Sequence, residues 1–214
     1  MKLKREVAKR LTPYMKAKGF MLSKGDYYYI ANDVAYCISL DTPSGIIYVT
    51  AYIIPLYVPC EGRYYTYGKR VQDYSLPQLS KDSSTAEIDK WCLALCQYFE
   101  DYVFPFFERI NSPDRIAKYV EKSRFTGIYE FSCPPIHLER LKLFTYLYLN
   151  DLTNVSKAID SYRKLLRKNE FLADSVKKKL LDEIDAVESA MQHDHLGILN
   201  LCTQIMYDTK KYFF

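Results

Sequence analysis

Long apolar runs are missing from this sequence of 214 residues. No stretch of about 18 or more apolar residues occurs, which argues against a transmembrane helix. The N-terminus begins with Met1-Lys2-Leu3-Lys4-Arg5. Because no apolar segment follows these charges, we expect no secretory signal peptide. The sequence therefore predicts a soluble, cytoplasmic protein without membrane insertion.

Glycine is scarce, with 7 residues, and the common catalytic motifs are absent. We find no GxxxxGK[ST], GxGxxG, GxSxG or HExxH pattern, which excludes the best-known signatures of nucleotide binding and hydrolysis. No CxxC pair occurs either, so we interpret the six cysteines as thiols and not as a disulfide framework. They are Cys37, Cys60, Cys92, Cys96, Cys133 and Cys202. We expect no cofactor.

The composition is that of an ordinary globular protein, 49% hydrophobic and 26% charged. The net charge of +4 is too small to indicate a nucleic-acid or membrane partner by itself. Tyrosine is the unusual feature: it occurs 21 times and is concentrated between Tyr27 and Tyr74. The sequence is thus rich in a residue that favours strands and interfaces.

The first third of the chain predicts a helix followed by a small sheet. Apolar residues at helical spacing indicate a helix over 3–18, with a kink or a new turn at Pro13 and an end at Gly19. Strands are predicted over 27–31, 34–40 and 46–54. Asn32-Asp33 forms a turn between the first two. In the third strand we expect an aliphatic face on the helix and a face with tyrosines opposite.

Residues 55–84 resemble a loop that is functional or contains a short strand. Ser84 and Glu87 then form a capping box that begins a helix. Its buried stripe includes Trp91 and extends to Tyr102, and Pro105 should end or bend it. Ser112-Pro113 begins another short helix.

After Cys133-Pro134-Pro135 the chain is predicted to be almost entirely helical. We therefore predict an α+β fold: an N-terminal helix plus a small antiparallel Tyr-rich sheet, followed by a mainly helical C-terminal half. Residues 1–132 should form the α+β part, with three or four strands. Residues 133–214 should form the helical part and share one core with the first. The expected helices are 136–149, 153–168, 174–191 and 196–211.

Four segments resemble a known family. They are the helix end Lys18-Gly19-Phe20, the strand Tyr27-Tyr28-Tyr29-Ile30, the strand from Ile46 that ends in Pro55-Leu56-Tyr57-Val58-Pro59, and the stretch Val103-Phe104-Pro105-Phe106-Phe107-Glu108-Arg109-Ile110. On these segments the N-terminal two-thirds of the chain resembles the DUF4304 family of uncharacterised bacterial proteins. The resemblance implies no site residues.

The loop at 55–74 is the predicted binding site. It combines aromatic and cationic side chains of the kind that anchor protein interfaces, namely Arg63, Tyr64, Tyr65, Tyr67 and Arg70. The same pairing of rings and cations can also stack bases and contact phosphates. The alternative without any binding role is that these tyrosines pack on their own sheet.

Two other groups of residues have catalytic or metal-binding chemistry. His193, Asp194 and His195, together with His137 and Asp208, distantly resemble the ligands of metal-dependent phosphohydrolases. We favour a plain interhelical turn there, with Asp194 as an N-cap. Cys92 and Cys96 lie four residues apart on one helix face, where packing is the better explanation. Cys60 and Cys133, by contrast, are expected to be exposed.

We therefore hypothesise a non-catalytic module that binds a protein or peptide through the Tyr/Arg loop. The first alternative is a nucleic-acid-binding protein that uses the same loop and the basic N-terminal helix. The second is a metal-dependent hydrolase at His137, His193, Asp194 and His195. An enzyme is the less favoured class, and the oligomeric state is open.

Overall fold

A basic amphipathic helix, α1 (Lys2–Ala17), opens the chain as predicted. Its buried stripe has helical spacing and consists of Leu3, Val7, Leu11 and Met15. No new turn begins at Pro13, since the helix continues through this residue. Pro13 removes one donor from the ladder, and burial of the stripe on both sides of it keeps the helix continuous.

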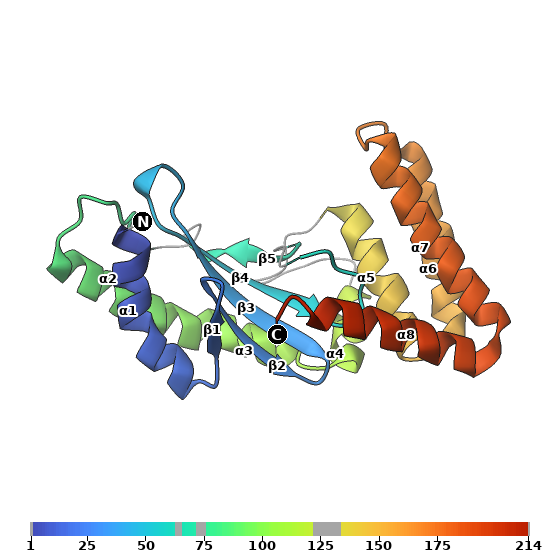
Figure 1. The fold of residues 1–214 in the computed structure, drawn as a ribbon, viewed down its shortest axis with the longest axis horizontal. Coiled ribbons are helices and arrows are strands. Elements are labelled where there is room, and N and C mark those ends of the chain that lie inside the picture. The colour runs from blue at the N-terminus through green and yellow to red at the C-terminus, as the bar shows by residue number, and fades with distance from the viewer. Residues whose placement is uncertain (1, 63–65, 72–75, 122–133, 214) are drawn as a thin grey trace. The chain divides into compact units, whose positions relative to one another are not determined.

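The computed structural model describes residues 2–62, 66–71, 76–121 and 134–213 (Figure 1). Two compact units are present. The first holds α1, the sheet and the helices up to Asn111, and the second holds residues 55–62 and the helices that follow Asn111.

Gly19 ends α1 as the sequence predicts. It has a φ of +84°, which an L-residue with a side chain adopts only at a cost. Its N–H donates to Lys16 O at 2.9 Å, and the Phe20 N–H donates to Met15 O at 2.9 Å. These two bonds form a Schellman motif. They turn the chain back so that the buried Phe20 enters the sheet.

The sheet is a five-stranded meander in the order β1-β2-β3-β4-β5. The strands are β1 (Met21–Ser23), β2 (Asp26–Ala31), β3 (Val34–Asp41), β4 (Tyr48–Pro55) and β5 (Tyr67–Arg70). Asn32 and Asp33 both have positive φ, at 50° and 60°, as a two-residue hairpin turn requires. The sheet thus has more strands than the predicted three or four, because β1 and the short strand hidden in the loop, β5, also pair.

The central strands are buried on both faces. Every residue of β3 from Val34 to Leu40 is buried, as is every residue of β4 from Val49 to Pro55. Tyr52 is only 1% exposed. The aliphatic side of β4 is buried, and on its other side Tyr52 is buried while Tyr48 is half-buried.

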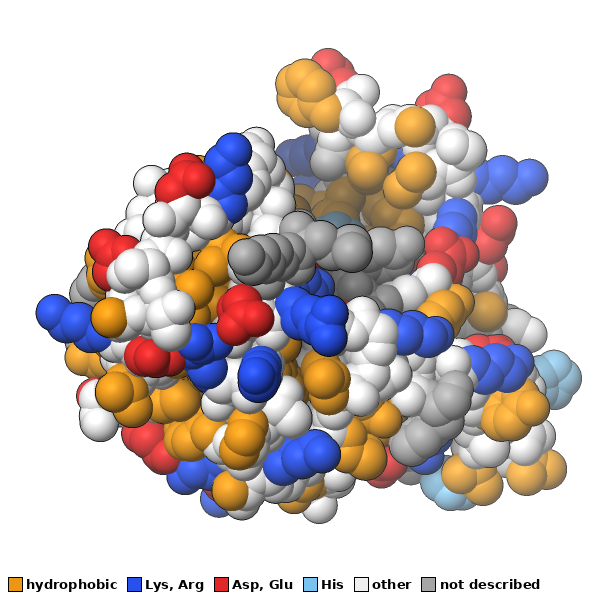
Figure 2. All heavy atoms as spheres, turned by 60° about the vertical axis from the view of Figure 1, so that its left-hand side comes forward, with side chains coloured by type: hydrophobic (Ala, Val, Ile, Leu, Met, Phe, Trp, Pro, Cys, Tyr) orange, Lys and Arg blue, Asp and Glu red, His pale blue; other side chains and the backbone are white. Residues whose placement is uncertain are grey.

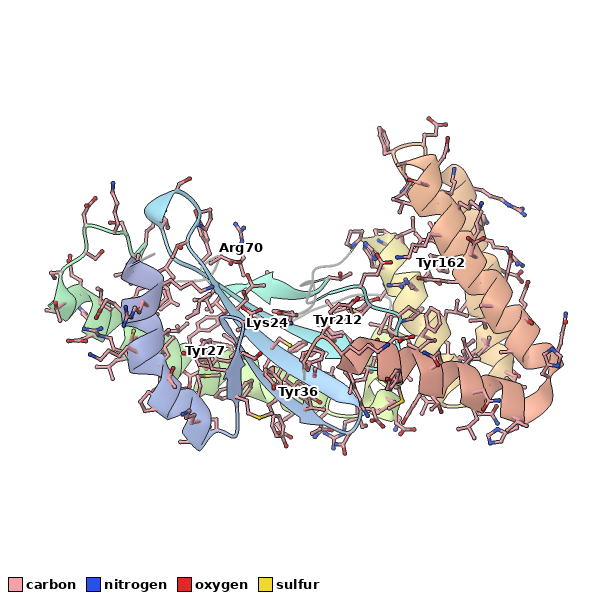
Figure 3. The ribbon with its side chains drawn as sticks, viewed as in Figure 1. Lys24, Tyr27, Tyr36, Arg70, Tyr162 and Tyr212 are labelled. Atoms are coloured by element: carbon pink, nitrogen blue, oxygen red, sulfur yellow. The ribbon has the colours of Figure 1, made fainter. Side chains whose placement is uncertain are left out.

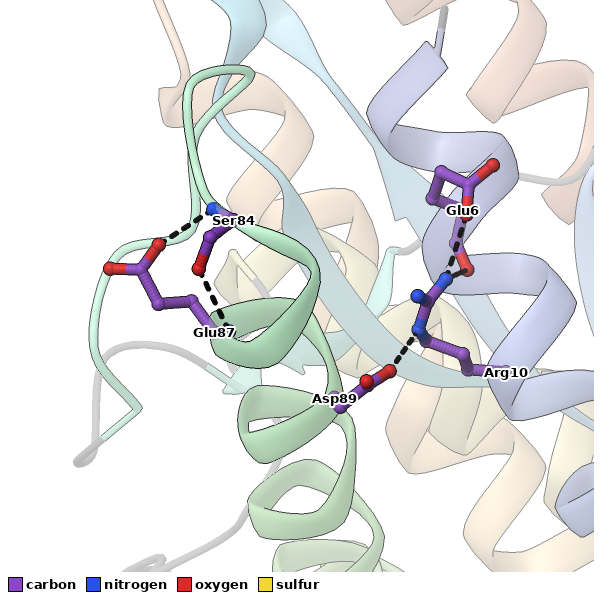
Figure 4. Close-up of polar contacts among 5 residues, drawn as sticks. All are labelled: Glu6, Arg10, Ser84, Glu87 and Asp89. Atoms are coloured by element: carbon purple, nitrogen blue, oxygen red, sulfur yellow. Dashed lines mark hydrogen bonds and ion pairs between the residues drawn. The ribbon is translucent and has the colours of Figure 1, made fainter.

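The predicted capping box begins α2 (Thr85–Tyr98) (Figure 4). Ser84 N donates to Glu87 Oε2 at 2.6 Å, and Glu87 N donates to Ser84 Oγ at 3.3 Å. Figure 4 also shows how Arg10 ties α1 to α2. It forms an ion pair with Asp89 while donating to Glu6 Oε2 at 2.8 Å. The two helices therefore pack as a pair within the first unit.

Pro105 neither ends nor sharply breaks the helical segment. A π-helical turn, η3 (Phe99–Val103), connects α2 to α3 (Phe104–Arg109). The Phe104 N–H donates to Phe99 O, five residues back. A proline lacks the N–H that the normal ladder needs and crowds the carbonyl four residues earlier. The wider turn accommodates both effects and lets the chain stay helical.

The second unit is helical. Its helices are α4 (Pro113–Val120), α5 (Pro135–Tyr148), α6 (Leu152–Lys168), α7 (Asp174–Gln192) and α8 (Asp194–Lys210). The first begins at Ser112, whose hydroxyl accepts from Arg115 N, as predicted. Buried side chains occur all round α5, and Tyr162 of α6 is fully buried (Figure 3). Residues 55–62 belong to this unit through bonds such as Thr209 Oγ1 to Val58 O at 3.4 Å.

The predicted α+β fold class is therefore confirmed. None of the helices in the described parts of the chain is long and apolar enough to cross a bilayer.

Candidate functional site

The predicted Tyr/Arg loop is only partly visible in the structure. Arg63, Tyr64 and Tyr65 lie outside the described residues. Tyr67 begins β5 and is 5% exposed, so its ring belongs to the core and offers no free surface. Arg70 is exposed, and its guanidinium carbon lies 4.6 Å from the centroid of the Tyr48 ring. A binding role for this loop stays a prediction.

The histidines do not form a metal centre among the residues that the structure describes. No group of three His, Cys, Asp or Glu side chains that could hold an ion is found in these residues. His137 is in α5, while His193 and His195 are exposed at the start of α8. The prediction of Asp194 as an N-cap is off by one position, because α8 begins at Asp194 itself and His193 precedes it.

The cysteines of α2 pack as predicted. Burial raises the pKa of the Cys92 thiol to about 11, and the pKa of Cys96 is raised to about 11 for the same reason. A thiol with so high a pKa is almost wholly protonated at neutral pH and is a poor nucleophile. Cys60 is half-buried, and Cys133 lies outside the described residues.

A pocket of about 310 Å³ in the first unit is the strongest candidate site. Its walls come from the end of α1, from β2 and β3, and from the η3–α3 segment. The lining residues are Lys18, Phe20, Tyr29, Ala31, Asn32, Tyr36, Glu100, Phe104, Phe107, Glu108 and Asn111. We call this the aromatic pocket. Its volume is at the small end of the range for ligand sites and suits one side chain or a small molecule.

Aromatic rings from four segments meet at this pocket. The ring centroids of Tyr29 and Tyr36 are 6.0 Å apart and stacked, and those of Tyr36 and Phe107 are 5.0 Å apart. The centroid of the Phe20 ring lies 5.9 Å from the ring centroids of both Tyr29 and Phe104. Tyr36 is directed from β3 toward α3 in Figure 3. The face of an aromatic ring carries partial negative charge and its edge carries partial positive charge. A cation is therefore attracted wherever the faces of these rings line the pocket wall.

Lys18 and Glu100 form one rim of the aromatic pocket. Lys18 Nζ is 2.6 Å from Glu100 Oε1 and 5.5 Å from the centroid of the Phe104 ring. The Tyr14 hydroxyl donates to the same carboxylate oxygen at 2.9 Å. The bonds from Lys18 and then Tyr14 lower the pKa of Glu100. This carboxylate is therefore charged at neutral pH, and a lysine ammonium already lies on the aromatic wall.

An acid and two amides also line the aromatic pocket. Asn111 Nδ2 donates to Glu108 Oε2 at 3.0 Å, and Asn32 Nδ2 donates to Asn111 O at 2.8 Å. These bonds hold the β2–β3 turn to the end of α3. The lining includes two carboxylates, Glu100 and Glu108, against one ammonium. Among the lining residues that the structure describes, acidic side chains therefore outnumber basic ones.

The π turn positions both carboxylates of the pocket lining and the Phe104 ring. Glu100 lies within η3, and Phe104 and Glu108 follow it in α3. Turns of this type are frequent at functional sites. The sequence signal was Pro105 inside a run of aromatic residues, which the prediction read only as a helix end or bend. That signal marks the segment, but it does not reveal which ring faces the pocket.

Two ionisable groups of the lining have shifted pKa values, and both shifts hold the group in its ordinary charge state at neutral pH. Burial, more than the nearby Glu108, raises the pKa of the Tyr36 hydroxyl, which keeps this group neutral. The pKa of the Glu100 carboxyl group is instead lowered, by its bonds from Lys18 and Tyr14. No His or Cys belongs to the described lining. A general acid or base works best with a pKa near the working pH, and neither shifted group meets that condition.

Comparisons with protein-family models, with curated proteins and with solved structures find no match to this chain. The resemblance to the DUF4304 family accordingly stays a prediction.

Proposed function

We propose that this chain is a non-catalytic binding protein that captures a protein or peptide partner by accepting one of its cationic side chains in the aromatic pocket. The observation that carries the proposal is the pairing of converging aromatic rings with a net acidic rim. A lysine, methylated lysine or arginine side chain has an apolar stem for the rings and a charged end for the carboxylates.

The surroundings of the pocket favour a peptide over a free metabolite. Phe20 leads directly into β1, the strand at one edge of the sheet. Met21 and Leu22 of this strand are 48% and 45% exposed. An extended segment of a partner can lie along such an edge while one of its side chains enters the adjacent pocket. The carboxylates of the pocket repel the negative charges of a phosphate backbone. Nucleic acid is therefore the weaker alternative for this site.

The test is a titration of the isotope-labelled protein with small probes, followed by NMR. We expect N-acetyl-arginine amide and N-acetyl-trimethyllysine amide to shift the amides of Lys18, Tyr29 and Asn111. Neutral N-acetyl-norleucine amide should bind at least about fivefold more weakly, because it lacks the charge that the rings and carboxylates attract.

Two matched variants make this test specific. Tyr29→Ala removes a wall of the pocket at a residue that is 41% exposed, so the fold should tolerate the change. Leu22→Ala removes a similarly exposed side chain on the neighbouring strand. We expect the first variant to abolish the shifts and the second to preserve them. Equal binding of neutral and charged probes, or unchanged binding by Tyr29→Ala, would disprove the proposal.

A further inference from the structure

The loop that joins α6 to α7 carries a fully exposed phenylalanine. Phe171 is 100% exposed, and Val176 in the first turn of α7 is 44% exposed. The Phe171 N–H donates to Asn169 Oδ1 at 3.0 Å, which gives the loop a defined turn. Figure 1 shows this loop at the free end of the α6–α7 hairpin, and Figure 2 shows hydrophobic side chains on the surface there. Packing within the hairpin does not require this ring.

Basic side chains surround the hairpin behind this ring. Lys164, Arg167 and Lys168 are exposed in the last two turns of α6, and Lys178 is exposed in α7. The first three also line a surface groove of about 480 Å³ along α6. Within the described parts of the chain, no ion pair involves any of these four residues.

Arg163, the next cation along α6, shows the contrast. It donates to Glu188 at 2.7 and 2.6 Å and to Asp185 at 3.1 Å. The bonds to Glu188 come first among the causes that raise its pKa. This guanidinium holds α6 to α7 and is occupied. Among the residues that the structure describes, the cations nearer the loop have no ion-pair partner of this kind.

The charge of the hairpin end is positive overall. Residues 164–178 contain five Lys or Arg against Glu170 and Asp174, a net charge of +3. Asp174 is the first residue of α7, where a negative charge is favourable for the helix itself. Glu170 is then the one acid beside the exposed ring.

We propose that the end of the α6–α7 hairpin docks on an anionic lipid surface. Phe171, with the adjacent Leu172, enters the boundary between headgroups and acyl chains. The four free cations contact lipid phosphates. They lie one to two helical turns behind the loop, roughly 5–10 Å along the axis, which matches the depth to which interfacial apolar groups are buried. The docking involves no spanning helix.

A nucleic acid is the less suitable partner for this surface. Proteins that bind single strands stack successive bases on several aromatic rings. Here one ring stands at the apex of the turn, with the cations set back from it. An apolar apex with a basic collar is complementary to a bilayer interface, in which apolar chains lie beneath a layer of phosphates.

The experiment is co-sedimentation of the full chain with vesicles of phosphatidylcholine, with or without roughly one third phosphatidylserine. We expect binding only to the anionic vesicles, weakening as salt is added. Arg167→Glu with Lys168→Glu should reduce binding by at least about 30-fold, and Phe171→Ser by about five- to tenfold.

Matched controls separate a local surface from a general charge effect. Lys90→Glu with Lys118→Glu changes the net charge equally at two exposed positions outside the hairpin, and Leu93→Ser removes another exposed apolar side chain. Both should bind as the unchanged protein does. Three results would overturn the proposal: no sedimentation with anionic vesicles, equal loss in the controls, or tip variants that impair binding to a single-stranded oligonucleotide but not to vesicles.

Discussion

Lys18 Nζ and Glu100 Oε1 lie 2.6 Å apart in the lining of the aromatic pocket, although the two residues are 82 positions apart in the chain. Lys18 directly follows the last residue of α1, and Glu100 comes from the π turn. Their pairing means that Lys18 neutralises half of the acidic rim. Glu108 is the second carboxylate of the described lining, and it accepts a hydrogen bond from Asn111 Nδ2 at 3.0 Å.

The two rim charges should affect a cationic ligand in opposite directions. Lys18→Met removes a competing ammonium, so the affinity for N-acetyl-arginine amide should rise by about two- to fivefold. Glu108→Gln keeps the shape and the bond from Asn111 but removes a charge, so the affinity should fall by a similar factor. Dissociation constants from NMR titration at low salt give the answer. Changes of the same sign in both variants would contradict the assigned rim electrostatics.

Trp91 should be a major contributor to stability. It is 2% exposed, and its Nε1–H donates to Pro77 O at 2.9 Å. Trp91→Ala should therefore lower the free energy of unfolding by about 3–5 kcal/mol. Trp91→Phe keeps most of the packing but loses the hydrogen bond, at about 1–2 kcal/mol.

Urea unfolding followed by circular dichroism suits the Trp91 series, because the chain has one tryptophan and these variants lose its fluorescence. Leu93→Ala, at a position 73% exposed on the same helix, is the control and should change stability by no more than about 0.5 kcal/mol. A loss below about 1 kcal/mol for Trp91→Ala would show that this side chain is not part of the core.

An ion pair between α5 and α7 should show strong coupling. Arg140 donates to Glu183 through two bonds of 2.7 and 2.6 Å, and both side chains are mostly buried. Removing one partner takes away the main compensation of a buried charge, so Arg140→Met or Glu183→Leu alone should cost about 3 kcal/mol. The double variant should cost less than either single change.

A double-mutant cycle measures this coupling from the unfolding free energies of the four proteins. The exposed pair of Lys211 and Asp208, 2.6 Å apart on one helix end, provides the control cycle and should show coupling close to zero. If the coupling free energy of Arg140 and Glu183 is also close to zero, the bidentate ion pair contributes nothing to holding the two helices together.

Local signals in the sequence identified most of the elements. The capping box at Ser84 and Glu87 and the turn at Asn32-Asp33 were predicted because each depends on bonds between residues no more than three apart. The buried stripes of the helices were predicted because apolar residues spaced three or four positions apart lie on one face of a helix. The strand β1 was missed, since three residues are too few to show alternation, and its pairing comes from β2.

The candidate site could not be predicted in the same way. The aromatic pocket forms from Lys18, Tyr29 and Phe104, which only the tertiary fold brings together. The loop was favoured for its interface-type residues, yet Tyr67 packs inside, because β5 pairs with β4 and places Gly68 opposite Tyr52. A Cβ at Gly68 would lie 2.3 Å from Tyr52 Cβ. Composition alone does not show which of these aromatic side chains the fold buries.

The cysteines provide the last prediction, which concerns pH. The pKa of Cys92, Cys96 and Cys202 is raised to about 11, mainly because burial disfavours the thiolate. At about pH 8 the folded protein should therefore be alkylated by iodoacetamide at these three positions roughly 100-fold more slowly than the chain unfolded in urea. Cys60, which is half-buried, should react first. Peptide mapping by mass spectrometry measures each rate.

The same shift fixes the sign of the alkaline response. A pKa that is higher in the folded state favours folding while the thiols are protonated, so this contribution is complete below the ordinary thiol pKa of 9.0. It is lost as the pH rises through about 11. The urea concentration at the unfolding midpoint should fall as the pH rises across this window. The midpoint of Cys202→Ala should fall less steeply, because this variant has one buried thiol fewer. Rapid alkylation of Cys92 in the folded protein below about pH 9 would show instead that α2 opens to solvent.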